Sequence, residues 1–254
     1  MKSHTQPVSK RHRTLLLSSL GLLAGAALGM AWRGDDVQAR AGFAWRRLVG
    51  GRTVAERVAQ HEADVRQRLQ PLLAGAGLAS TPREVALLAF KDTRQLALYA
   101  RDEPTVPWQR VTTYHVQGAS GGPGPKLREG DLQVPEGVYR VTLLNPNSRF
   151  HLSLRLDYPN EVDRQMALAD GRDRLGGDVM IHGTAASIGC LAMGNEAAED
   201  LFVLAAWVGI ENMRVIISPT DFRVAHVQDP IVTVPWAGSL YAMLRSELSN
   251  YPLT

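Results

Sequence analysis

Cysteine is almost absent from this sequence. The 254 residues include a single one, Cys190, which excludes an internal disulfide and the paired cysteines of a structural zinc site. In an oxidising compartment thiols are usually paired, so a lone thiol there is either a buried structural residue or one that takes part in chemistry. Both interpretations of Cys190 stay open until its neighbours are considered.

Positive charge is concentrated at one end of the chain. The formal net charge is +3, but Lys2, Lys10, Arg11 and Arg13 precede residue 14, and the remaining residues sum to −1. Nucleic-acid binding requires a basic face that displaces counterions from phosphates. After residue 33, lysine and arginine are interleaved with aspartate and glutamate, so the sequence predicts no nucleic-acid partner.

The usual motifs of metal and phosphate sites are also missing. There is no HExxH segment and no carboxylate at metal-ligand spacing, so the sequence predicts neither a metal site nor a cofactor. His115 and His151 are interpreted as structural residues. The glycine-rich run from Gly118 to Lys126 lacks the serine or threonine that follows the lysine of a phosphate-binding loop. It predicts a hairpin or a loop at the rim of a substrate site.

A run of 19 uncharged residues, Thr14 to Trp32, follows the basic cluster. Such a run is long enough to cross about 30 Å of hydrocarbon as a helix. The basic residues before it predict that the N-terminus stays in the cytoplasm and that the rest is exported to the periplasm. We interpret residues 1–32 as an export signal or inner-membrane anchor. Small-residue sites at Ala24–Ala26 and Val37–Ala39 leave cleavage as a signal peptide open.

The next segment predicts a helix. Thr53 and Glu56 have the spacing of a capping box, and apolar residues recur on one stripe at helical spacing: Val54, Val58, Val65, Leu69 and Leu72. The helix is expected to end near Pro71, before a linker marked by Gly75–Gly77 and Pro82. We interpret residues 33–82 as a helical spacer and linker.

Between residues 83 and 220 the pattern is that of short strands. Turn residues, among them 145–147, separate runs rich in Val, Leu, Ile, Thr and Tyr. The predicted strands are Val85–Phe90, Gln95–Tyr99, Arg110–Val116, Gly137–Leu143, Arg149–Leu156, Asp178–His182 and Met213–Ile217. One helix is expected from an N-cap at Asn195 to Gly209. The fold class is therefore mainly β, an antiparallel sandwich or barrel with one or two helices, followed by a C-terminal extension at 221–254.

The segment from Ile181 to Met193 places a histidine and the lone cysteine on either side of a short loop. A thiol needs a nearby base to become a thiolate, and His182 is the candidate base for Cys190. Gly183 and Gly189 border the loop and allow backbone to approach a substrate closely. The N–H groups of Gly189 and Cys190 are candidate oxyanion donors. Spacing alone does not establish contact between His182 and Cys190.

This segment resembles the motif of the L,D-transpeptidase catalytic domain family (YkuD-like), in which a His-Gly pair is followed after a short loop by Ser-x-Gly-Cys. The matching residues are His182, Gly183, Ser187, Gly189 and Cys190. The similarity extends upstream through 124–131, 134–137 and 145–153, and covers about Glu84 to Ser218. Many members carry Arg two residues after the Cys, where this chain has Ala192. The pair Ala192-Met193 resembles the YafK-like branch of the family.

The resemblance implies an envelope enzyme without a cofactor that acts on peptidoglycan stem peptides through a thioester on Cys190. His182 would be base and then acid, and the Gly183 carbonyl would orient it. Ser187 belongs to the matching motif and is a candidate substrate-binding residue. Because the family's Arg is missing, the candidates to hold a substrate carboxylate are Lys126, Arg128 and Arg149.

Three functions stay open at this point. An amine acceptor makes such a site a transpeptidase, and water makes it a hydrolase of peptidoglycan-linked peptides or of a peptidoglycan-linked protein, since one chemistry serves both. The third is a non-catalytic envelope module that keeps the fold and binds through its groove. The intact His182, Ser187, Gly189 and Cys190 favour an enzyme, because a binding module has no need of a thiol.

Overall fold

A computed structural model describes residues 50–224 and 234–253. The predicted anchor, Thr14–Trp32, and its two candidate cleavage sites lie outside these residues. Among the helices that are described, none combines the length and the apolar composition needed to cross a bilayer.

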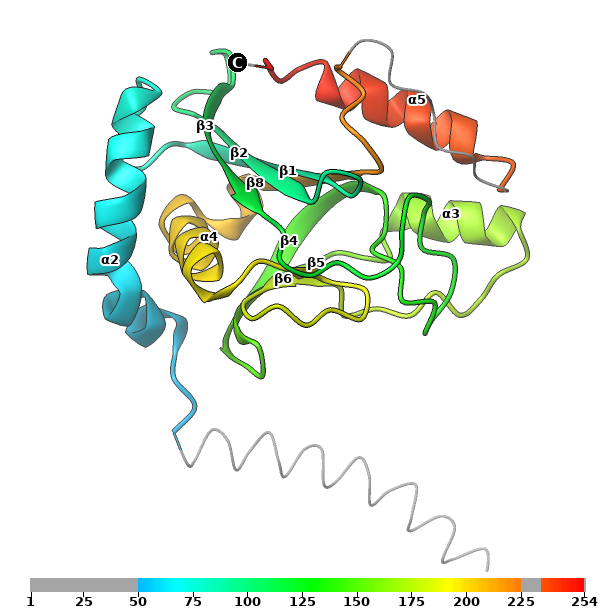
Figure 1. Cartoon of the computed structure of the whole chain (residues 1–254), viewed down its shortest axis with the longest axis horizontal. Helices are drawn as coiled ribbons and strands as arrows, with labels where there is room; N and C mark the ends of the chain where they lie inside the picture. The colour runs from blue at the N-terminus through cyan, green and yellow to red at the C-terminus, as the bar shows by residue number, and fades with distance from the viewer. Residues whose placement is uncertain (1–49, 225–233, 254) are drawn as a thin grey trace, which may run out of the picture. The chain divides into compact units, whose positions relative to one another are not determined.

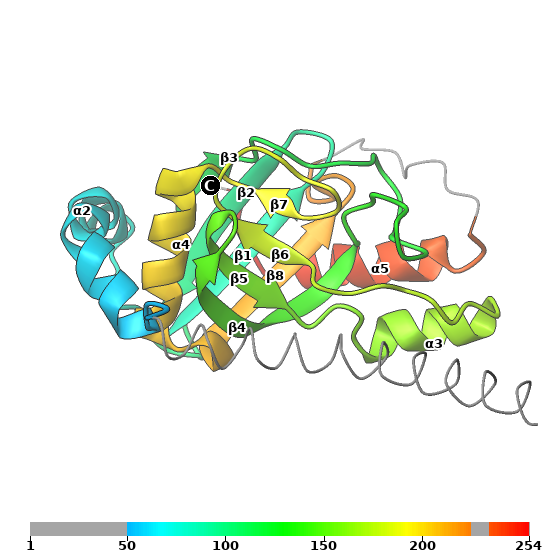
Figure 2. The same ribbon diagram turned by 90° about the horizontal axis from the view of Figure 1, so that it is seen from below.

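The described strands form one curved, eight-stranded sheet in the order β3-β2-β1-β8-β4-β5-β6-β7 (Figures 1 and 2). Their bounds are β1 Glu84–Phe90, β2 Gln95–Arg101, β3 Gln109–His115, β4 Gly137–Ser148, β5 His151–Leu156, β6 Met180–His182, β7 Leu191–Ala192 and β8 Met213–Ser218. Most neighbours are antiparallel, whereas β1 with β8 and β6 with β7 are parallel. The mainly β fold class is confirmed, and the sheet is mixed.

Helices cover the sheet on both sides. They are α2 Val54–Gly75, α3 Glu161–Ala169, α4 Asn195–Val208 and α5 Ala237–Leu248. Figure 1 shows α5 on one side of β1 and β8, and α2 and α4 on the other. The predicted boundaries at residues 82 and 220 stay predictions, but both α2 and α5 belong to the cores that the sheet forms.

Burial on both faces explains why the sequence of strand β1 is continuously apolar. Successive side chains of a strand point to opposite faces. Val85, Leu87 and Ala89 enter the core with α2 and α4, while the other set enters the core with α5: Ala86, Leu88 and Phe90. A strand buried on both faces needs apolar residues at every position.

Helix α2 begins as predicted and ends later. Thr53 and Glu56 form the capping box, but the helix continues through Pro71 to Gly75. Proline lacks an N–H group and removes a helical hydrogen bond, and here burial of the next turn offsets that loss. Leu73 follows Leu69 at four residues and is fully buried, whereas Leu72 is 40% exposed. The prediction that Leu72 completes the buried stripe was wrong by one position.

The hairpin between β4 and β5 differs from the prediction. The Asn145-Pro146-Asn147 segment was predicted as a turn, but β4 runs through it to Ser148. The register shifts between Asn145 and Ser148, so an irregularity in the strand accommodates the proline. The turn itself is at Arg149 and Phe150, and β5 therefore begins at His151.

The remaining helices agree with the predictions only in part. Asn195 is not the N-cap of α4, because Gly194 occupies that position with φ +77°. Gly209 ends the helix as predicted, with φ +87°. Helices α3 and α5 were not predicted at all, although Asn160 and Asp163 form a capping box at the start of α3.

Adjacent leucines in α2 test how this helix is held. Leu73→Ala removes a fully buried side chain and should lower the free energy of unfolding by about 2–5 kcal/mol. Leu72→Ala, the matched control on the exposed side, should cost about 0.5 kcal/mol. Urea unfolding followed by circular dichroism measures both. Equal losses would mean that the helix does not pack through the Leu73 side.

Candidate active site

Strand pairing brings the predicted histidine and cysteine to one place. β6 and β7 are parallel neighbours, with Ile181 opposite Leu191 and His182 opposite Ala192 (Figure 2). The Met193 N–H donates to the His182 carbonyl at 2.8 Å. Cys190, immediately before β7, therefore lies beside the strand that ends in His182, and residues 183–190 form the loop between them.

His182 is held in one tautomer. Its Nδ1 lies 2.6 Å from the Gly183 carbonyl oxygen, and a carbonyl only accepts, so Nδ1 carries the proton and the lone pair of the neutral ring is on Nε2. Phe150 stacks on the ring at 4.7 Å between centroids and 29° between planes. Burial lowers the pKa of His182, and the hydrogen bond to Gly183 opposes that shift. The ring is thus a neutral base at pH 7.

Gly183 has no space for a side chain. A Cβ at this position would lie 2.8 Å from Asn195 Oδ1, 2.8 Å from the Phe150 carbonyl oxygen and 2.9 Å from the His151 Cβ. Asn195 Oδ1 accepts a hydrogen bond from the Thr184 N–H at 2.9 Å. The Asn195 side chain, predicted as a helix cap, therefore holds the start of the loop between His182 and Cys190 instead.

Ser187 organises the end of that loop. Its Oγ donates to the Cys190 carbonyl at 2.6 Å and accepts from the N–H groups of Cys190, at 3.0 Å, and of Gly189, at 3.3 Å. Gly189 has φ +125°, a conformation that L side chains rarely adopt. Ser187 thus supports the cysteine loop. The predicted oxyanion role of the Gly189 N–H stays a prediction and requires Ser187 to share or release that donor.

Cys190 is half-buried and electrically neutral at pH 7. Burial raises the pKa of the thiol, a hydrogen bond from the Met180 backbone lowers it, the Asp178 charge raises it and the Lys126 charge lowers it. The Sγ atom donates to the Asp178 carbonyl at 3.8 Å. Within the described ranges no hydrogen bond joins the thiol to the His182 side chain, and burial disfavours the charged forms of both groups.

The three basic candidates differ in their surroundings. Lys126 Nζ is already paired with Asp131 Oδ1 at 2.6 Å and donates to the Arg128 carbonyl at 2.9 Å, so it influences Cys190 through its charge. Arg128 and Arg149 are exposed. Arg149 is the chain neighbour of Phe150, which stacks on His182.

Ala192 leaves no room for the arginine that many family members carry. Its side chain is fully buried, and its backbone exchanges two hydrogen bonds with Gly118, at 2.9 and 3.1 Å. Gly118 begins the glycine-rich run that was predicted to form a rim loop. A guanidinium at position 192 would displace this contact.

A second polar cluster was missed from the sequence. His61 of α2, His151 of β5 and Glu199 of α4 place potential ligand atoms within 4.8 Å of one another. Burial lowers the pKa of His61, and the Glu199 charge opposes this shift. Because three separate elements supply the side chains, no local spacing reveals the cluster. The interpretation of His151 as an isolated structural residue was incomplete, whereas His115 is exposed at the end of β3.

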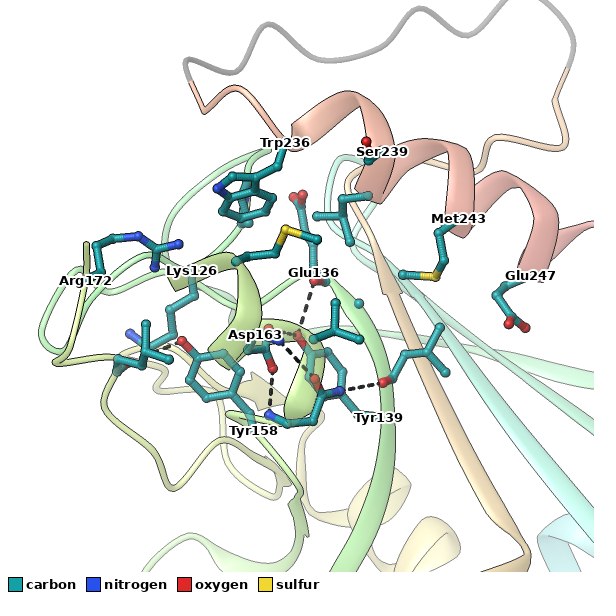
Figure 3. Close-up of a pocket in the computed structure, with 18 residues that line it drawn as sticks. Lys126, Glu136, Tyr139, Tyr158, Asp163, Arg172, Trp236, Ser239, Met243 and Glu247 are labelled. Carbon is teal, nitrogen blue, oxygen red and sulfur yellow. Dashed lines mark hydrogen bonds between the residues drawn. The ribbon is translucent and has the colours of Figure 1, made fainter. Parts of the chain in front are cut away.

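A pocket of about 360 Å³ lies between β4, α3 and α5 and does not include Cys190 or His182 (Figure 3). Its charged groups are already paired: Lys126 with Asp131, Arg172 with Asp170 and Glu136 with Lys91. Burial raises the pKa of Asp163 in its wall to about 6. Because neither Cys190 nor His182 lines it, the pocket is assigned no part in the cysteine chemistry.

His182 ends β6 and Cys190 immediately precedes its parallel neighbour β7, on a mixed, mainly antiparallel sheet. The L,D-transpeptidase catalytic domain family (YkuD) matches residues 84–217, more than half of the chain. The chain belongs to this family, as its sequence motif predicted.

The chain is also similar to a curated protein and to solved structures of other proteins. YafK of Escherichia coli (strain K12), named as a candidate L,D-transpeptidase, is 38% identical over 120 residues, which are 46% of this chain and 46% of that protein. The match thus spans about half the length of the relative. Among solved structures, the helical cell shape determining protein Pgp2 of Campylobacter jejuni has a TM-score of 0.43 at 19% identity, covering 72% of this chain and 64% of that one. L,D-transpeptidase 1 of Mycobacterium tuberculosis has a TM-score of 0.32 at 13% identity, covering 53% and 62%.

Charge changes beside Cys190 should move its pKa in opposite directions. Asp178→Asn removes a negative charge that raises the pKa of the thiol, so the pH profile of iodoacetamide labelling should shift to lower pH. Lys126→Gln removes a positive charge that lowers this pKa and should shift the profile to higher pH. Intact mass after timed labelling measures both. Shifts of the same sign would contradict the arrangement of charges around the thiol.

Proposed function

We propose that this chain is a peptidoglycan L,D-transpeptidase that works through a thioester on Cys190. The observation that carries this proposal is the hydrogen bond between His182 Nδ1 and the Gly183 carbonyl. It leaves Nε2 as the basic atom of a ring whose strand lies beside Cys190. Membership of a family named for L,D-transpeptidase catalysis supplies the reaction class and peptidoglycan peptides as its substrates.

The chemistry begins with two neutral partners. Nε2 of His182 takes the proton from Cys190 Sγ as the thiolate attacks a carbonyl of a tetrapeptide stem. This carbonyl belongs to a meso-diaminopimelate or similar residue and is joined by an amide bond to the terminal D-alanine. The C–N bond breaks, His182 returns the proton to the departing amine of the terminal D-alanine, and a thioester remains. An amine acceptor then attacks the thioester, loses its proton to His182 and returns the sulfur as a thiol.

A neutral resting pair suits this sequence of steps. A buried thiol with a raised pKa and an imidazole with a lowered pKa stay uncharged until a substrate displaces water and brings its carbonyl to the sulfur. The proton then moves within the site and not to solvent. We place the reaction in the periplasm, on the basic N-terminal tail and the uncharged run Thr14–Trp32, with residues 1–32 as anchor or export signal.

The nucleophile is tested by replacing the sulfur. Cys190→Ala should abolish turnover on purified muropeptides and also covalent labelling by a carbapenem, read by intact mass, with the circular dichroism spectrum unchanged. Activity within about tenfold of the parent, ~1.4 kcal/mol in barrier, would contradict the assignment. In the parent, the muropeptide products distinguish transfer, which joins two peptides, from hydrolysis, which releases D-alanine alone. No carbapenem labelling and no turnover in the parent would favour a binding module.

The base is tested separately from the thiol. His182→Ala should slow carbapenem acylation by about 10²–10⁴-fold, the usual contribution of a positioned acid–base group. Above the pKa of the thiol, iodoacetamide should still alkylate Cys190 in the variant, because a thiolate needs no base. Phe150→Leu is the matched control, since it removes the stacked ring but keeps the imidazole. An acylation rate in His182→Ala equal to that of the parent would show that His182 does not act on Cys190.

A further inference from the structure

The cluster of His61, His151 and Glu199 joins the spacer helix to the catalytic sheet. Glu199 Oε1 lies 2.7 Å from His151 Nε2 and 3.4 Å from His61 Nδ1, and the two imidazole rings meet edge to face at 5.4 Å. Helices α2 and α4 and the first residue of β5 each supply one side chain. All three are buried or partly buried.

These side chains are the ligand types that zinc takes in proteins. Imidazole nitrogen and carboxylate oxygen bind Zn²⁺ at about 2.0–2.2 Å, and two histidines with one glutamate make a three-ligand set that leaves a position for water. Ligand atoms around a tetrahedral zinc are roughly 3.3 Å apart. The His61–Glu199 pair already has a spacing of 3.4 Å, and the His151–Glu199 pair opens from 2.7 Å by a small side-chain rotation.

The polar groups of the cluster are not satisfied by one another. His61 Nε2 is buried and has no hydrogen-bond partner among the described residues. Its ring is held by polar contact only through Glu199, and a buried polar atom without a partner is costly. Nδ1 is the His61 atom near Glu199, so a cation in the cluster would bind Nδ1 and would leave Nε2 as it is. The side chains of His151 and Glu199 keep 20% and 16% of their exposure, which admits a water ligand.

The charge around the cluster allows a divalent cation. Arg57 is the opposing group, since its Nη2 lies 3.4 Å from the His151 carbonyl. Arg68, however, is shared by three carboxylates at 2.8 to 3.9 Å, those of Glu196, Glu199 and Asp200. The neighbouring carboxylates therefore outnumber the two guanidiniums, and Glu199 Oε2 is oriented by Arg68 while Oε1 faces the histidines.

We infer that His61, His151 and Glu199 bind one Zn²⁺ ion, which fastens helix α2 to the catalytic domain. The site is separate from Cys190, but its residue His151 lies close to His182 in the packing. His151 directly follows Phe150, which stacks on His182, and both residues border the tight space at Gly183. A bound ion would hold this corner of the sheet, and with it the His182 ring on which Phe150 stacks.

Zinc titration of the full chain tests this inference. The chain carries Cys190→Ala, because a thiol beside an imidazole binds zinc by itself, and it is first freed of metal with a chelator. Calorimetry should then give one equivalent of Zn²⁺ and a raised unfolding temperature. His61→Gln, His151→Gln and Glu199→Gln should each weaken binding by at least about tenfold. His115→Gln, an exposed histidine outside the cluster, should bind as the parent does.

Cobalt keeps the test decisive where a variant folds poorly. Co²⁺ in a four-coordinate nitrogen and oxygen site gives visible absorption bands that free Co²⁺ lacks, so the Cys190→Ala chain alone reports the geometry. No binding of either ion, or binding that the three cluster variants leave unchanged, would overturn the inference and leave a His–Glu hydrogen-bonded contact. Metal binding is measured without any assay of catalysis. A negative result would therefore contradict the zinc site and leave the proposed transpeptidase activity untouched.

Discussion

The close contact at Gly183 is the constraint on which the rest of the site depends. A side chain there would collide with Asn195, with the Phe150 carbonyl and with His151. The absence of a side chain lets the β4–β5 hairpin, the start of α4 and the catalytic loop meet. That meeting places Phe150 on the His182 ring and sends the Gly183 carbonyl to Nδ1. A glycine is therefore needed here for space and not for an unusual φ angle.

Burial shifts the pKa values of Cys190 and His182 in opposite directions. Desolvation disfavours the charged forms of both groups, so the pKa of Cys190 rises and that of His182 falls. Each shift acts against a permanent thiolate–imidazolium pair. The same burial keeps the Nε2 lone pair of His182 available, because a protonated imidazole has none.

Several polar residues support the backbone of the loop. Ser187 closes three hydrogen bonds around Gly189 and Cys190, and Asn195 receives the Thr184 N–H. Lys126 is committed to Asp131. Ser187 and Asn195 thus bond to the backbone of the loop. A loop without regular backbone pairing needs such partners for its N–H and carbonyl groups. Ala192 is buried against Gly118, where the close packing leaves room only for a small side chain.

The sequence alone determined the local features of this protein. The apolar runs predicted the strands, the Thr53–Glu56 pair predicted the start of α2, and the His182–Cys190 segment predicted the family, because each depends on residues close together in the chain. Only the tertiary structure decided which neighbours these elements meet. Leu73 and not Leu72 faces the core, Asn145–Asn147 continue a strand, and the parallel pairing of β6 with β7 requires a strand of two residues that no pattern reveals. The cluster of His61, His151 and Glu199 arises where α2, β5 and α4 pack together, and contacts between distant segments leave no periodicity in the sequence.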